Sequence, residues 1–89
     1  MKNFIIGIDI SCKTLDICVK ELQDLTHFKI ENSQKAILKF FNNYKGKQAI
    51  VAMENTGRYN WNLFEVLTKF HFNVYVLNPL HLSKSLGLV

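Results

Sequence analysis

The sequence has little of what marks disordered, secreted or membrane-spanning chains. Only one of its 89 residues is proline and 48% are hydrophobic, a composition typical of a folded globular chain. No apolar run approaches the ~20 residues that a membrane helix needs, and an acidic residue interrupts the N-terminal apolar run where a secretory leader would continue. We therefore expect one soluble domain with a single core, located in the cytoplasm.

Cysteine and histidine are too few and too poorly spaced for a zinc site. The two cysteines, Cys12 and Cys18, form no CxxC pair and have no histidine companion. The three histidines show no ligand spacing either. We expect reduced thiols and assign no zinc ligand.

Acidic residues are outnumbered by basic ones. Seven Asp and Glu stand against 11 Lys and Arg, which gives a formal net charge of +4 and a pI near 9.2. This balance modestly favours polyanionic partners. The lysines are nevertheless scattered along the chain without a continuous run, so a solvated surface explains them about as well.

Hydrophobic periodicity in the first half predicts three strands and a helix. Residues 4–10 form a nearly continuous apolar run, which predicts a central strand buried on both faces. Alternating patterns predict strands over 15–20 and 26–30, joined to the first as an antiparallel meander. Asn32 or Ser33 can cap an amphipathic helix that Gly46 ends.

The second half continues as strand, helix and strand. A buried strand is predicted over 48–53, a helix is predicted from the spacing of the apolar residues between 63 and 70, and a further strand is predicted over 73–77. Asn78-Pro79 breaks this strand, and 80–86 is predicted to begin a third helix. This α/β order, a three-strand antiparallel meander followed by strand-helix-strand crossovers, matches the ribonuclease H-like fold.

Two carboxylates stand where a core is expected. Asp9 lies inside the first apolar strand, and Glu54 closes the strand over 48–53. If these strands are parallel neighbours, both side chains emerge at the C-terminal edge of the sheet, where open α/β sheets place their sites. Oxygen ligands of this kind suit Mg²⁺ or Mn²⁺ and a metal-assisted phosphodiester reaction.

Simpler explanations exist for both acids. Asp9 can lie at a solvated strand end, where it caps the following turn or pairs with Lys13. Glu54 can be an ordinary carboxylate near a helix N-terminus, where the helix dipole favours it. Lys13 and Arg58 flank the acids and can contact phosphate, although such residues are more often only solvated. Asp16 is expected to face solvent.

The loop after Glu54 offers further candidates for nucleic-acid contact. Thr56 and Gly57 can fix the turn from strand to helix. Tyr59, with Trp61, can stack on a base, although packing at the start of the helix is the more common role of such residues.

Four short motifs together resemble a known family. They are Ile6-Gly7-Ile8-Asp9-Ile10-Ser11, Lys13-Thr14-Leu15-Asp16-Ile17, Glu54-Asn55-Thr56-Gly57-Arg58-Tyr59 and Val76-Leu77-Asn78-Pro79. Their order and spacing are similar to the N-terminal RuvC-like domain of DEDD-type insertion-sequence transposases, and the resemblance covers essentially the whole chain.

The resemblance implies a bacterial or archaeal transposase that cuts and rejoins DNA with divalent metal, in which Asp9 and Glu54 are the first two of four acidic ligands. It implies that Asp9 bridges the metal ions and that Glu54 holds one of them. The family also implies a guide RNA and a C-terminal domain with a serine, which no residue here matches.

The sequence departs from the family pattern in its length. The last two aspartates of the family follow the Asn-Pro motif, and this sequence has no acid after Glu65. Residues 1–89 are therefore expected to be the N-terminal part of a RuvC-like catalytic domain, truncated and inactive by itself. Exposed apolar surface at the missing helices can drive self-association into a homo-oligomer.

Two other functions fit parts of the sequence. A fragment of an actin-like ATPase shares the opening strand order, but its phosphate turn needs glycine and none follows Asp9 closely. A nucleic-acid-binding or dimerisation module without catalysis would use the basic surface and not the acids.

Overall fold

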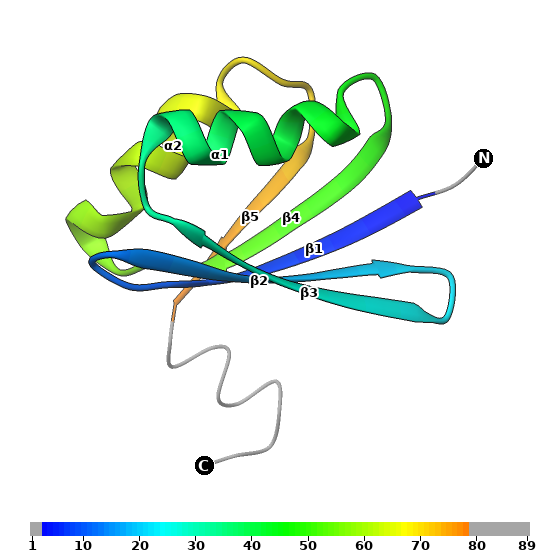
Figure 1. Ribbon diagram of the computed structural model, residues 1–89, viewed down its shortest axis with the longest axis horizontal. Coiled ribbons are helices and arrows are strands. Elements are labelled where there is room, and N and C mark those ends of the chain that lie inside the picture. Colours follow the sequence, from blue (N-terminus) through cyan, green and yellow to red (C-terminus); the bar gives the residue numbers. More distant parts are fainter. Residues whose placement is uncertain (1–2, 79–89) are drawn as a thin grey trace, which may run out of the picture.

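The strands form one mixed sheet. The computed structural model describes residues 3–78, and its strands are β1 (Asn3–Ile10), β2 (Thr14–Glu21), β3 (Asp24–Glu31), β4 (Gln48–Glu54) and β5 (Asn73–Leu77). Their order across the sheet is β3-β2-β1-β4-β5 (Figure 1). The first three strands pair antiparallel, whereas β4 pairs parallel with β1 and with β5. The predicted meander and the central place of β1 are confirmed.

Both helices lie on the same face of this sheet (Figure 1). Helix α1 (Gln34–Phe41) continues into the 3-10 turn η1 (Asn42–Tyr44), and the 3-10 turn η2 (Gly57–Asn60) leads into α2 (Trp61–Leu67). Ser33 is the N-cap of α1, because its hydroxyl accepts a hydrogen bond from the amide of Ala36. The element order confirms the predicted ribonuclease H-like fold.

The core lies between the helices and one face of the sheet. Alternate strand residues point toward the helices, and the apolar side of each helix packs against them. The buried apolar residues are Phe4, Ile6, Ile8, Ile10, Leu15, Ile17, Val19, Ile37, Phe40, Phe41, Ala49, Val51, Met53, Leu63, Val66 and Leu67. The carboxylates are therefore held on strands whose opposite side anchors the whole domain.

The other face of the sheet, called the open face below, is not covered by any element of residues 3–78. The prediction that β1 is buried on both faces is therefore wrong for this part of the chain: Ile5 is 46% exposed and Ile50 on β4 is 36% exposed. Their apolar side chains gave the run its two-sided pattern, yet both helices pack on the opposite side. The pocket that holds the acids lies on this open face.

The third helix, predicted over 80–86, lies outside the described residues. Within residues 3–78, none of the helices is long and apolar enough to cross a membrane.

Candidate functional site at the carboxyl edge of the sheet

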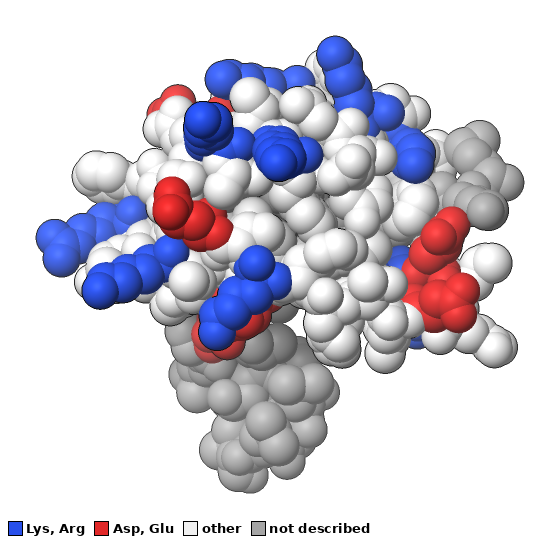
Figure 2. All heavy atoms as spheres, in the orientation of Figure 1, with Lys and Arg blue, Asp and Glu red and all other residues white. Residues whose placement is uncertain are grey.

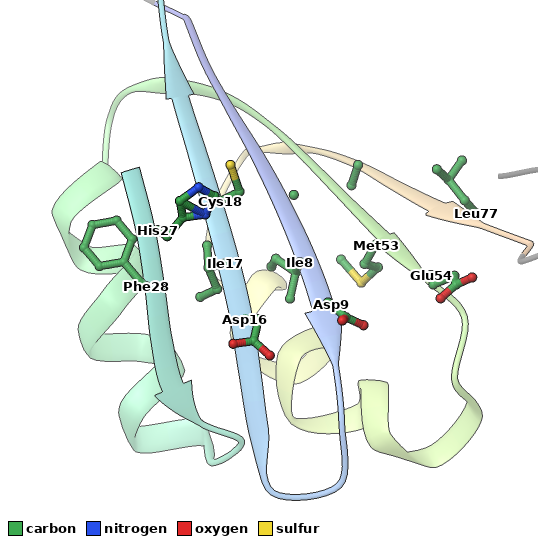
Figure 3. Close-up of a pocket in the computed structure, with 12 residues that line it drawn as sticks. Ile8, Asp9, Asp16, Ile17, Cys18, His27, Phe28, Met53, Glu54 and Leu77 are labelled. Carbon is green, nitrogen blue, oxygen red and sulfur yellow. The ribbon is translucent and has the colours of Figure 1, made fainter. Parts of the chain in front are cut away.

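Asp9 and Glu54 lie on neighbouring parallel strands at the same edge. Ile8 and Met53 are register partners in the β1–β4 pair, so the next residue of each strand is one of the two acids. Both acids line one open cavity of about 630 Å³ on the open face (Figure 3). The placement predicted from strand order is therefore present in the fold.

Asp9 is exposed and is not a buried charge. The expectation that this carboxylate stands within a core is therefore wrong for residues 3–78, and no cost of burying a charge argues for its function. The simpler roles are not seen either: Ser11 and Thr14 close the following turn with each other. Among residues 3–78, no hydrogen bond or ion pair joins Asp9 to Lys13.

A third carboxylate, Asp16, lies directly opposite Asp9 in the β1–β2 ladder. It lines the same cavity, and Figure 3 shows Asp9 between Asp16 and Glu54 across the sheet. Asp16 is exposed as expected, and its ion pair with Lys29 is 3.9 Å long with both side chains more than half exposed, so that pair is weak. Sequence reasoning missed this juxtaposition, which follows only when the hairpin register is known.

Glu54 is half-buried, and the loop that follows it is fixed by Asn60. The Asn60 side chain is fully buried. Its Nδ2 donates to the carbonyl of Glu54 at 3.1 Å, and its Oδ1 accepts from the amide of Thr56 at 2.7 Å and from the Thr56 hydroxyl. One amide side chain thus holds the end of β4 against the start of α2, and sequence reasoning did not single it out.

Asn32 fixes the second loop at this edge. Its Nδ2 donates to the carbonyl of Ser11 at 2.9 Å and to the carbonyl of Tyr59 at 3.1 Å. Its own carbonyl accepts from Asn62 Nδ2 at 3.0 Å. The β1–β2 turn and the start of α2 are therefore joined through Asn32, so the two loops beside the acids are held relative to each other.

The other candidates surround this edge without lining the cavity. Lys13 and Arg58 are exposed, and the Arg58 guanidinium lies 5.4 Å from the centre of the Tyr59 ring. Interaction with the Tyr59 side chain raises the pKa of Arg58, so this cation stays charged. Tyr59 packs against the core, whereas the expected packing role of Trp61 is wrong, because its side chain is 68% exposed.

The carboxylates that line the cavity are of the ligand type that suits a hard divalent cation, but too few of them converge in the described part of the chain to form a complete site. Carboxylate oxygens are the ligands that Mg²⁺ and Mn²⁺ prefer, and these ions commonly keep water and substrate phosphate among their ligands. Asp9 and Asp16 are like charges directly opposite each other, a pairing that costs free energy unless a cation offsets it. Within residues 3–78, however, no group of three or more His, Cys, Asp or Glu is arranged to hold a metal ion.

Comparison with known families matches the chain to a transposase family. The sequence model of the DEDD transposase family of the IS110 type, described as a transposase, matches residues 6–87. No curated protein matches the chain. The family match gives no support to the actin-like ATPase alternative.

Proposed function

Because the chain belongs to the IS110 group of DEDD transposases, we propose that it supplies Asp9 and Glu54 to a divalent-metal site that acts on DNA phosphodiester bonds. The family implies divalent metal and a DNA partner.

One observation carries this assignment: two acids lie near the carboxyl ends of adjacent parallel strands and line one open cavity. The strand ends are held by buried apolar neighbours and by Asn60, so the backbone that carries the two acids is fixed before any ligand arrives. A fixed backbone lowers the cost of ordering the ligands on binding.

Each residue has a defined part in this proposal. Asp9, on the central strand, and Glu54, at the end of β4, would hold the metal. A bound divalent ion would supply Lewis-acid stabilisation of charge on phosphate oxygens. Lys13 and Arg58 would contact phosphates of the DNA from the flanking loops, and Tyr59 would hold Arg58 in place.

Residues 1–89 are proposed to be the N-terminal part of a RuvC-like catalytic domain. Asp9 and Glu54 would fill only part of the coordination shell of a divalent ion. The remaining ligand positions are open to further carboxylates, as the DEDD pattern implies. The chain by itself is therefore expected to bind metal weakly and to cut DNA poorly.

Metal binding tests the site directly. We expect Mn²⁺ titration, followed by electron paramagnetic resonance, to show that Asp9→Asn weakens binding at least tenfold. Folding should remain intact or be slightly stabilised, because the substitution removes one of two facing like charges. Urea unfolding measures this second effect.

The matched control is Asp24→Asn, which makes the same charge change at the β2–β3 turn, outside the cavity. Its Mn²⁺ affinity should equal that of the unchanged chain. Unaltered Mn²⁺ affinity in Asp9→Asn would rule out the site assignment. In that case the non-catalytic nucleic-acid-binding alternative would be preferred, provided that DNA binding were also indifferent to metal.

A further inference from the structure

A second cavity lies at the opposite end of the parallel strands. It has a volume of about 680 Å³ and is bounded by the loop before β4, by the first residues of β4 and β5, and by the loop between α2 and β5. Gln48 begins β4 and Glu54 ends it, so at ~3.3 Å per residue the two ends of this strand are roughly 20 Å apart.

The lining of this second cavity, called the basic groove below, is strongly positive. Lys45 and Lys47 contribute from the loop before β4, and Lys69 with His71 from the loop before β5. Within residues 3–78, no acidic side chain lines it. Figure 2 shows basic side chains along the upper edge of the view, where Figure 1 places the loops that precede β4 and β5. The fold thus gathers lysines that the sequence scatters.

Lys47 is partly pre-positioned. Its ammonium nitrogen lies 5.3 Å from the centre of the Phe4 ring and 5.9 Å from that of Tyr44. Burial, together with the nearby Glu21 carboxylate, raises the pKa of Tyr44. Glu21 lines a neighbouring cavity with Lys47 and Tyr44, but it does not line the basic groove. The aromatic contacts restrict Lys47 while leaving it exposed.

The aromatic residues of the basic groove are not free to stack on bases. Phe70 and Phe72 stack on each other, with ring centres 5.0 Å apart and planes 10° apart, and both also contact the buried Phe41. Proteins that hold single strands usually offer aromatic faces to successive bases. This groove offers charge without such a platform, which favours the backbone of a duplex.

We infer that the basic groove is a second DNA-binding site, which contacts the phosphate backbone of a duplex about 20 Å from the carboxylates. At 3.4 Å per base pair, this distance is roughly six base pairs. The inference of DNA, and not another polyanion, rests on the proposed transposase function. The site itself involves none of the proposed metal ligands.

The test measures DNA binding without metal. A short fluorescein-labelled duplex is titrated with the 89-residue chain in EDTA, by fluorescence anisotropy at several salt concentrations from roughly 50 to 200 mM. Changing Lys45, Lys47 and Lys69 together to Gln should weaken binding at least tenfold at the lowest salt. The slope of log affinity against log salt should fall by about 2 to 3, since each phosphate contact contributes about 0.9.

The matched control changes three exposed lysines outside the groove, Lys20, Lys35 and Lys39, to Gln. It removes the same net charge and should alter the slope by less than about 1. Equal losses in the two triple variants would overturn the inference, because general charge would then explain the binding.

A second variant of the basic groove keeps the test valid if the triple Gln variant does not fold. The double variant Lys45→Glu and Lys69→Glu leaves Lys47 and its ring contacts in place. It should bind the DNA duplex at least tenfold more weakly than its charge-matched control, Lys20→Glu with Lys39→Glu. Tighter binding of a single strand or of an RNA duplex than of the DNA duplex would overturn the choice of ligand. Because EDTA removes metal, this measurement does not depend on the proposed metal site, and failure here is distinct from failure of that site.

Discussion

At the residue scale, Asn60 has the largest structural role that the sequence conceals. Its side chain is buried and uses both ends of its amide within one loop, toward Glu54 and Thr56. A buried amide is tolerated only when its hydrogen bonds are made. Asn60 is therefore a positioning residue for Glu54, which acts through the backbone of the loop.

We expect Asn60→Ala to lower the free energy of unfolding by about 2 to 4 kcal/mol, because it leaves the Glu54 carbonyl and the Thr56 amide without their partners. Urea denaturation followed by circular dichroism measures this loss. Asn43→Ala is the control, since Asn43 is exposed and makes only one local hydrogen bond, to the Phe40 carbonyl. A loss no larger than that of the control would contradict the role given to Asn60.

The exposure of Asp16 could be predicted from the sequence, whereas its position opposite Asp9 could not. The sequence indicated that Asp16 is exposed, which is confirmed, but gave no reason to connect it with Asp9. The connection depends on hairpin register, because a shift of one residue would move Asp16 to the other face of the sheet. The carboxylates at this edge are thus three neighbours and not the two that the sequence suggested.

At the element scale, the β2–β3 hairpin contains a strained residue. Glu21 pairs with Asp24, so Leu22 and Gln23 form a two-residue turn. Leu22 has a φ of 57° and is 73% exposed. A residue with a side chain is disfavoured in this left-handed region, and glycine is preferred at the first position of such turns.

We therefore expect Leu22→Gly to stabilise the protein by about 0.5 to 1 kcal/mol, because the relief of backbone strain exceeds the added entropy of the unfolded chain. Thermal unfolding would show the gain as a higher Tm. Gln23→Gly, at a position without positive φ, should instead be neutral or destabilising. A lower Tm for Leu22→Gly than for Gln23→Gly would show that the turn is not strained in this way.

At the scale of the whole molecule, the two proposed sites occupy opposite ends of β4. The acids lie at its carboxyl end and the basic groove lies at its amino end. A separation of roughly 20 Å exceeds the ~8 to 10 Å over which charges interact at moderate salt. The sheet can therefore hold opposite charge at its two edges without one neutralising the other.

Because of this separation, we expect substitutions at the two sites to change the free energy of unfolding independently. Asp9→Asn combined with Lys45→Glu and Lys69→Glu should change the free energy of unfolding by the sum of the separate changes, to within about 0.5 kcal/mol. Urea denaturation of the single, double and triple variants, at a salt concentration near 0.1 M, completes the cycle. A coupling above about 1 kcal/mol would mean that the two edges interact through the fold.

The sequence by itself determined the elements and their order. The 2-residue and 3.6-residue periods of apolar side chains are local properties, so the strands, the helices and the Ser33 cap could be predicted. Strand order then put Asp9 and Glu54 at one edge, because parallel strands end on the same side. The predicted helix that Gly46 ends is α-helical as far as Phe41, and its last turn, Asn42–Tyr44, is a 3-10 turn, which periodicity does not distinguish well.

Only the tertiary structure decided which residues far apart in the chain come together. Ile5 and Ile50 are as apolar as the core residues beside them, yet they lie on the open face because both helices pack on the other. Lys69 joins Lys45 and Lys47 because β5 pairs with β4. Periodicity shows which residues share a face of one element, whereas pairing and packing between elements decide what that face meets.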